Sequence, residues 1–80
     1  MKLKKHYHNI QKMINIKDYI GKSFVGKKLH LKCDCLIGID ITGYCVLYKI
    51  HDNEIILYIE YNDKQIPIGL NTPNLQIEVL

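Results

Sequence analysis

Apolar and polar residues alternate with a period of two over much of the chain after Lys28. The apolar members of the first alternating run all have odd numbers: Leu29, Leu31, Cys33, Cys35, Ile37, Ile39 and Ile41. Alternation of this kind is typical of a half-buried β-strand, because successive side chains point to opposite faces. The run is too long for one straight strand, so Gly38 predicts a bend, bulge or loop between Leu36 and Gly43.

Three more alternating segments are separated by two short turn sequences. A two-residue turn at Asp52-Asn53 pairs Ile50 with Ile55, Tyr48 with Leu57, and Val46 with Ile59. The same construction at Asn62-Asp63 pairs Ile59 with Ile66, Leu57 with Ile68, and Ile55 with Leu70. Both turns place apolar side chains on one face, as strand register requires. The pattern therefore predicts a three-stranded meander.

The meander also predicts an apolar group on its outer face. The residues expected to point away from the core are Cys45, Leu47, Ile56 and Tyr58. A monomer seldom leaves such a patch uncovered. Pro67 suits an edge strand, and a fifth short strand follows the turn at residues 71–74.

The first twenty residues have helical rather than strand spacing. Leu3, Tyr7, Ile10 and Ile14 form one narrow stripe, opposite Lys2, Lys5 and Lys12. This predicts a basic helix or arm over residues 1–20, helical from about 2 to 16 and ended between Asp18 and Gly21. Its apolar stripe could cover the outer face of the meander, with another chain as the alternative. Eighty residues form one domain, 1–80, with a five-stranded β-barrel over residues 28–80.

A short N-terminal helix followed by five strands, with a tight turn between the last two, resembles the SH3-like small barrels, including Sm-like proteins. Gly43 before the long bent hairpin and Asp52 in its turn are similar to residues that Sm-like strands use. The resemblance implies a mainly β, antiparallel fold with one short helix. The chain lacks the basic and aromatic loop residues of Sm-like RNA-binding proteins, so it does not imply their RNA specificity.

Charge is distributed unevenly along the chain. Residues 1–32 hold nine lysines against Asp18 alone, a net charge of +8, whereas residues 33–80 hold two lysines against seven acids, a net charge of −5. This asymmetry favours an anionic partner for the basic segment, with packing against the acidic half of the same molecule as the alternative. The residues expected to contact a polyanion are Lys2, Lys4, Lys5, Lys12, Lys27 and Lys28. All basic residues except histidine are lysine, so no bidentate guanidinium contact is available.

Three groups of residues invite a chemical interpretation, and each is opposed by its context. His30, Cys33, Cys35 and Cys45 resemble a zinc set, but parity places His30 on the face opposite Cys33 and Cys35. The segment from Gly21 to Lys28 has nearly the spacing of a phosphate-binding loop, but Lys28 replaces the Ser or Thr and a strand follows. His51 beside Asp52 falls in a hairpin turn. We therefore expect no metal, no cofactor and no catalysis.

Three functional hypotheses follow from the sequence. The first is a non-catalytic interaction module that binds a polyanion, most readily nucleic acid, through its lysine-rich N-terminal segment. The second is a protein–protein inhibitor or adaptor of phage or mobile-element origin, of the anti-defence or anti-CRISPR type, which uses Leu47, Ile56 and Tyr58 on a host or phage protein. The third is an oligomeric protein that binds a small nucleotide. No apolar run is long enough for a membrane span, and a cytoplasmic protein is expected.

Overall fold

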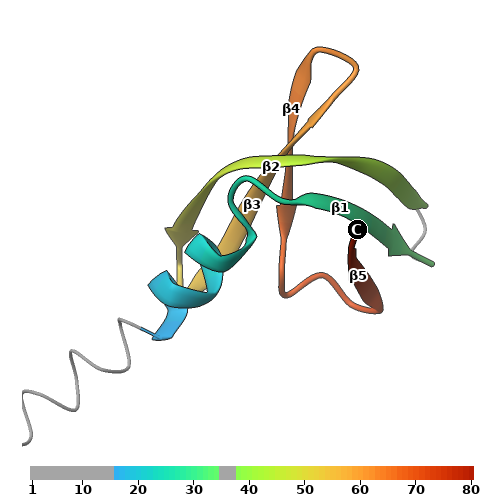
Figure 1. The fold of residues 1–80 in the computed structure, drawn as a ribbon. Coiled ribbons are helices and arrows are strands. Elements are labelled where there is room, and N and C mark those ends of the chain that lie inside the picture. The colour runs from blue at the N-terminus through green and yellow to red at the C-terminus, as the bar shows by residue number, and fades with distance from the viewer. Residues whose placement is uncertain (1–15, 35–37) are drawn as a thin grey trace, which may run out of the picture.

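The computed structural model describes residues 16–34 and 38–80, which form one short helix and a five-stranded antiparallel sheet (Figure 1). The helix covers residues 16–24. The strands are β1 (Lys28–Cys33), β2 (Ile39–His51), β3 (Glu54–Tyr61), β4 (Lys64–Gly69) and β5 (Leu75–Val79). Their order in the sheet is β4-β3-β2-β1-β5. The predicted class, mainly antiparallel β with five strands and one short helix, is confirmed.

The sheet is open, which corrects the expectation of a barrel. Strands β4 and β5 follow each other in the chain but form the two outer edges of the sheet, and they do not pair with each other. Only residues 70–74 connect them, so the sheet must bend strongly to bring its edges near, as Figure 1 shows. Pro67 lies in β4 and has no N–H to donate, so this strand is poorly suited to a ladder on its second side.

The first alternating run is divided between two strands. β1 ends at Cys33 and β2 begins at Ile39, with Leu31 opposite Ile41 and Cys33 opposite Ile39. Gly38 takes a positive φ of 64°, a left-handed conformation that glycine adopts without a steric penalty. The interruption predicted at Gly38 is confirmed, but its predicted extent to Gly43 is wrong, because β1 already ends at Cys33 and residues 39–43 belong to β2.

The two predicted turns are present, and their strands pair as expected next to them. Asp52, Asn53, Asn62 and Asp63 all have positive φ, between 48° and 66°. Two consecutive left-handed residues form the turn that matches the twist of a β-hairpin, and Asn and Asp tolerate this conformation best after glycine. The predicted pairs are observed: Ile50 with Ile55, Tyr48 with Leu57, Ile59 with Ile66, and Leu57 with Ile68.

A β-bulge in β2 overturns the prediction for Val46 and Cys45. The register shifts between Cys45 and Leu47, so Cys45, and not Val46, lies opposite Ile59. The extra residue reverses the facing of every position before it. Cys45 therefore points into the core, where it is fully buried, and does not belong to the outer face. Leu47 still lies opposite Tyr58, as predicted.

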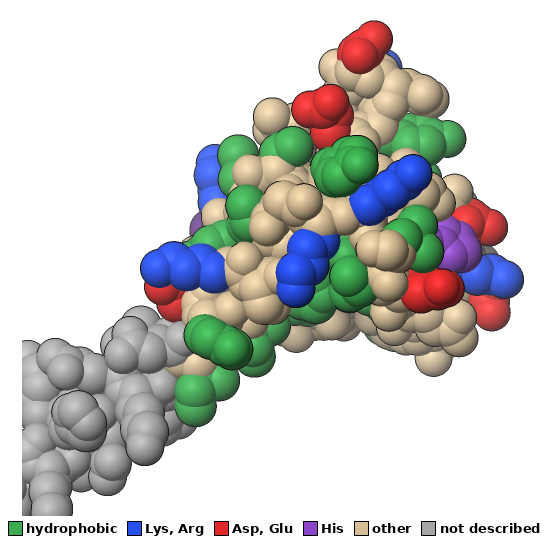
Figure 2. Space-filling model, viewed as in Figure 1, with side chains coloured by type: hydrophobic (Ala, Val, Ile, Leu, Met, Phe, Trp, Pro, Cys, Tyr) green, Lys and Arg blue, Asp and Glu red, His purple; other side chains and the backbone are tan. Residues whose placement is uncertain are grey.

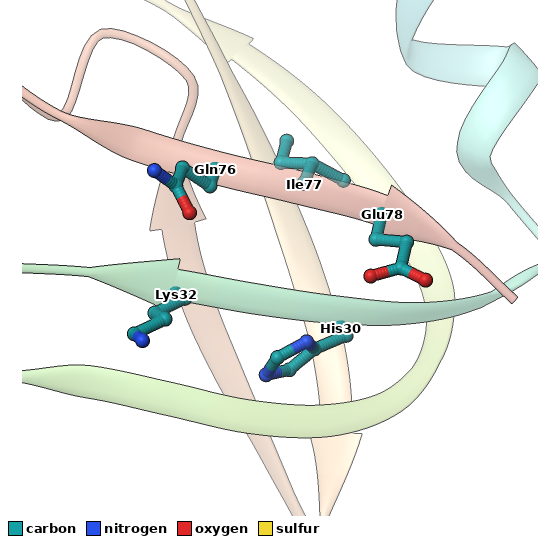
Figure 3. A pocket seen from close by; sticks show the side chains of 5 residues that line it. All are labelled: His30, Lys32, Gln76, Ile77 and Glu78. Atoms are coloured by element: carbon teal, nitrogen blue, oxygen red, sulfur yellow. The ribbon is translucent and has the colours of Figure 1, made fainter.

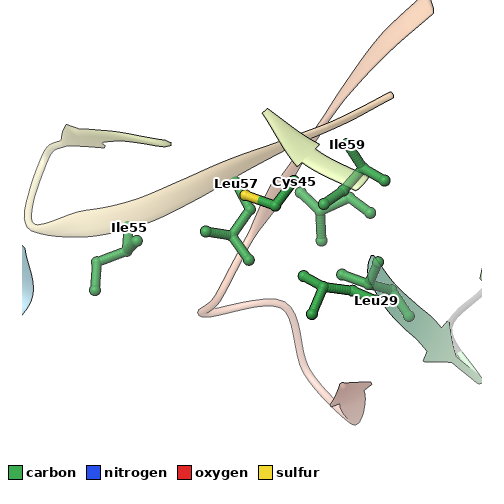
Figure 4. Packing of buried hydrophobic residues seen from close by; sticks show 7 residues of the cluster. Leu29, Cys45, Ile55, Leu57 and Ile59 are labelled. Carbon is green, nitrogen blue, oxygen red and sulfur yellow. The ribbon is translucent and has the colours of Figure 1, made fainter. Parts of the chain in front are cut away.

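The core lies on the concave side of the bent sheet (Figure 4). Its buried members come from β1, β2, β3 and β4: Leu29, Leu31, Cys45, Ile55, Leu57, Ile59 and Ile68. Phe24 from the end of the helix and Tyr48 from β2 pack against this cluster. The helix of residues 16–24 therefore covers the inner side of the sheet, not its outer face.

The predicted end of the helix, between Asp18 and Gly21, is wrong. Helical structure continues to residue 24, and Gly21 lies within it, buried directly against the Tyr48 ring. A Cβ at this position would lie 2.3 Å from a ring carbon of Tyr48, so only glycine allows the helix this close to β2. The predicted stripe Leu3, Tyr7, Ile10 and Ile14 lies outside the described residues. Within the described ranges, no helix is long and apolar enough to cross a membrane.

Candidate functional site

The lysines predicted to contact a polyanion fall into two sets. Lys2, Lys4, Lys5 and Lys12 lie outside the described residues. Lys27 and Lys28 are exposed and lie where the helical segment passes into β1. Backbone hydrogen bonds fix this junction: Gly26 N donates to Cys45 O at 2.8 Å, and Cys45 N donates to Lys27 O at 3.0 Å. The two ammonium groups thus project from a backbone that is tied to β2.

The described lysines of the first half do not pair with acids of the second half. Lys22 forms an ion pair with Asp18 at 3.3 Å, within the helix, and Lys17 donates to the backbone and side chain of Asn53. Lys27, Lys28 and Lys32 form no ion pair with any residue that the structure describes. Figure 2 shows several lysine side chains projecting separately from one face, some surrounded by apolar and neutral surface and others beside acidic side chains. The ammonium groups of Lys27, Lys28 and Lys32 therefore have no ion-pair partner among the described residues.

A polar contact holds the helix to β2. The Tyr48 hydroxyl donates a hydrogen bond to Asp18, and Lys22 lies on the other carboxylate oxygen of Asp18. The hydrogen bond from Tyr48, followed by the nearby Lys22 ammonium, lowers the pKa of Asp18 below its usual 3.8. The same bond raises the pKa of Tyr48 above 10.0, because ionised tyrosine would face a carboxylate. Sequence reasoning missed this contact, because the two residues are thirty positions apart.

The predicted protein-binding residues Leu47, Ile56 and Tyr58 lie together on the outer face of β2 and β3. All three are partly exposed, and Tyr58 has Leu47 opposite it on β2 and Pro67 opposite it on β4. The Lys49 ammonium lies 5.4 Å from the centre of the Tyr58 ring, a cation–π distance. We call Leu47, Ile56, Tyr58 and Pro67 the outer apolar patch. The described helix does not cover it.

The other half of the outer face carries a polar group that sequence analysis did not assemble. His30 Nε2 lies 2.7 Å from Asp40 Oδ1, across the β1–β2 ladder. A pocket of about 300 Å³ lies beside this pair, between β1 and β5, and is lined by His30, Lys32, Gln76, Ile77 and Glu78 (Figure 3). The pairing of β5 with β1 brings these residues together. The sequence gives no signal for that pairing, which joins residues more than forty positions apart.

The histidine and cysteines that suggested zinc do not converge among the described residues. Cys33 and Cys45 are buried on the core side, and Cys35 lies outside the described ranges. Burial raises the pKa of the Cys45 thiol, which keeps it protonated and unreactive. Within residues 16–34 and 38–80, no group of three or more His, Cys, Asp and Glu side chains could hold a metal. His30 faces the opposite side of the sheet, as its parity predicts.

The two remaining candidate motifs have structural positions. Residues 21–24 of the loop-like segment belong to the helix, and Lys28 begins β1, so the helix ends inside the segment and a strand follows it. A phosphate-binding loop needs the opposite order, because a helix N-terminus supplies the N–H donors. His51 Nε2 lies 3.2 Å from Asp52 Oδ2, and both side chains are at least three-quarters exposed at the β2–β3 turn.

Comparison with known proteins does not extend this description. No family model, curated protein or solved structure matches the chain.

Proposed function

We propose that this protein is a non-catalytic interaction module that binds a polyanion, most readily nucleic acid, through its lysine-rich first 32 residues. The observation that supports this proposal most directly is that the described lysines of the basic half are not neutralised by acids of the acidic half. Within the described residues, no lysine of the basic half forms an ion pair with an acid of the acidic half. Among the described residues, the charges of Lys27, Lys28 and Lys32 therefore have no ion-pair partner. A phosphate backbone supplies the regularly spaced anions that separate lysine side chains contact.

We include in the same proposal that the sheet has an SH3-like fold. Five short antiparallel strands, a bent sheet and the return of β5 to β1 support it. The close approach at Gly43 also supports it, because a Cβ there would lie 2.2 Å from Glu60 O. Gly43 thus allows β2 to bend where its ladder with β1 meets its ladder with β3. The open edge between β4 and β5 distinguishes this sheet from a closed barrel.

The polyanion proposal is tested by the salt dependence of binding. The probe is a fluorescein-labelled 30-nucleotide DNA, single-stranded and then duplex, and binding to the full chain is measured by anisotropy at increasing KCl. For three to five phosphate contacts, log K should fall against log salt with a slope of about −2 to −5. A slope near zero, or no binding at physiological salt, would contradict the proposal.

A pair of variants with the same net charge makes the test specific. Lys27→Gln with Lys28→Gln should reduce the slope by about 1–2. Lys49→Gln with Lys64→Gln removes the same charge from the acidic half and should leave the slope unchanged. Replacing Lys2, Lys5 and Lys12 together by Gln should weaken binding further. Equal effects of the two double variants would mean that net charge alone, and not the basic segment, attracts the probe.

A second candidate function is protein–protein inhibition or adaptation, of the anti-defence type, through the outer apolar patch. The position of the helix on the inner side of the sheet favours it, since Leu47, Ile56 and Tyr58 are left partly exposed. This hypothesis predicts that Tyr58→Ala abolishes protection of a phage in a host defence assay while circular dichroism shows a native fold. It also predicts that the Lys27 and Lys28 double variant retains full protection.

A further inference from the structure

The pocket between β1 and β5 is built from long polar side chains on the outer face of the sheet. His30 lies opposite Glu78, and Lys32 lies opposite Gln76, in the antiparallel ladder. Figure 3 shows the Gln76 and Lys32 side chains at one end of the pocket and those of Glu78 and His30 at the other. Ile77 lies between Gln76 and Glu78 in β5, and its side chain points to the other side of the strand, where it packs against the core. At about 300 Å³, the pocket is at the small end of the range for ligand sites.

Two opposite charges line this pocket without neutralising each other. Lys32 and Glu78 occupy diagonal positions on neighbouring strands, which places their backbones about 7–8 Å apart. Neither forms an ion pair with any described residue. Asp40, directly opposite Lys32 on β2, is instead bound to His30. An ammonium and a carboxylate therefore both remain available at the pocket.

The contact with Asp40 determines what His30 offers to a ligand. His30 Nε2 is 2.7 Å from Asp40 Oδ1, so in the neutral ring this nitrogen carries the proton and donates it to the carboxylate. The other ring nitrogen, Nδ1, is then an acceptor with no partner among the described residues. Together with the Glu78 carboxylate, it gives this end of the pocket two acceptors, whereas the Lys32 ammonium and the Gln76 amide give the other end its donors.

We propose that this pocket binds a small zwitterion of the α-amino acid class. The ligand carboxylate contacts the Lys32 ammonium and the Gln76 amide, and the ligand ammonium contacts Glu78 and His30 Nδ1. A phosphate dianion is disfavoured, because two carboxylates, Asp40 and Glu78, lie here against one lysine. A nucleobase is disfavoured as well, because no Phe, Tyr or Trp side chain lines the pocket and the His30 ring is held by Asp40. This proposal does not depend on the polyanion hypothesis.

The experiment compares one amino acid with its two singly blocked forms. L-leucine, N-acetyl-L-leucine and L-leucinamide are each titrated at pH 7 into the isotope-labelled full chain, and backbone amide shifts are followed by NMR. We expect saturable shifts for L-leucine at His30, Lys32, Gln76 and Glu78, and at least tenfold weaker binding of each blocked form. Equal binding of either blocked form, or shifts that do not saturate, would overturn the proposal. Saturable binding of adenosine monophosphate without binding of L-leucine would overturn it as well.

Charge variants assign each end of the ligand. In Lys32→Gln, L-leucine and L-leucinamide should bind equally, because the partner of the carboxylate is gone. In Glu78→Gln, L-leucine and N-acetyl-L-leucine should bind equally, because the main partner of the ammonium is gone. Glu60→Gln, an exposed acid on the outer face of β3, should retain wild-type binding of all three compounds. All three substitutions are at exposed positions, so we expect each variant to fold. The backbone amide spectrum of each variant checks this. If Lys32→Gln or Glu78→Gln left both discriminations intact, the assigned orientation would be contradicted.

Discussion

The two halves of β2 face the same core but present different outer surfaces. Residues 39–44 pair with β1, and the outer face there carries His30, Asp40 and the pocket beside them. Residues 44–51 pair with β3, and the outer face there carries the outer apolar patch. The two ladders meet at Tyr44, which has Lys28 on one side and Glu60 on the other. One strand thus separates a charged outer surface from an apolar one.

Both halves of β2 pack on the same core at the inner face of the sheet. The buried leucines of β1 and the buried residues of β3 belong to one hydrophobic cluster, whichever ladder they come from. Polar and apolar outer surfaces are therefore carried by the same core. Substitutions in the core should affect both surfaces together, whereas substitutions on one outer surface should leave the other unchanged.

The largest expected effect is loss of the shared core. Leu57→Ala, at a fully buried position in β3, should lower the free energy of unfolding by about 2–5 kcal/mol. In a domain of 80 residues, that loss approaches the whole stability. Urea denaturation followed by circular dichroism measures it. Glu60→Ala, exposed on the same strand, should change stability by no more than about 0.5 kcal/mol. The reverse order of the two effects would mean that the register of β3 is shifted by one residue.

The second effect concerns the point where the two halves join. Gly43→Ala should destabilise the protein by about 1–3 kcal/mol, because the new Cβ would press on the backbone of Glu60. The nearest atom, Glu60 O, is backbone and cannot rotate away. Gly38→Asn is the matched control: nothing lies within 4 Å of a Cβ there, and Asn tolerates its positive φ. Thermal unfolding compares the two, and equal losses would show that Gly43 does not limit the approach of β2 to β3.

The same junction marks the limit of what the sequence predicts. Local pairs next to a turn, such as Ile50 with Ile55, are correct because the turn itself fixes the register. The error begins at Val46, where the bulge inserts a residue that alternation cannot reveal, because Cys45 and Val46 are both apolar. The predicted pairs of β2 with β3 are wrong only for residues before the bulge. Leu47 and Tyr58 therefore lie on the outer face as predicted, whereas Cys45 lies in the core.

Long-range pairing explains what sequence analysis could not see at the candidate sites. The pocket requires β5 beside β1, and the attachment of the helix requires Asp18 beside Tyr48. Neither contact has a local signal, because both follow from how the sheet bends as a whole. The lysine asymmetry is different: it is a property of composition along the chain, and its prediction needs no fold. The sequence therefore pointed to a basic segment and missed the polar pocket.

The third prediction is that the contact between Asp18 and Tyr48, which attaches the helix to β2, stabilises the protein only within a defined pH range. The pKa of Asp18 is lowered in the fold, so the contact stabilises the protein above pH 3.8 and is lost as pH falls through the lowered pKa. The pKa of Tyr48 is raised, so the contact is complete below pH 10.0 and is lost as pH rises through the raised pKa. Wild type should therefore have a higher Tm than Tyr48→Phe between these limits, and the difference should shrink beyond both. Tyr61→Phe is the control, and a Tm difference independent of pH would refute the contact.

The smallest expected effect concerns the cation–π contact between Lys49 and Tyr58 on the apolar half of the outer face. Lys49 lies over the Tyr58 ring, and an exposed cation–π contact stabilises by about 0.5–1 kcal/mol. A double-mutant cycle with Lys49→Met and Tyr58→Leu keeps apolar bulk at both positions and isolates the charge–ring term. The coupling should be favourable and within that range, as measured by urea denaturation. The corresponding cycle with Lys32→Met and Tyr58→Leu joins one residue from each half of the sheet and should show no coupling. Coupling in the second cycle would mean that the two outer surfaces are not independent, and the division of the sheet at Tyr44 would fail.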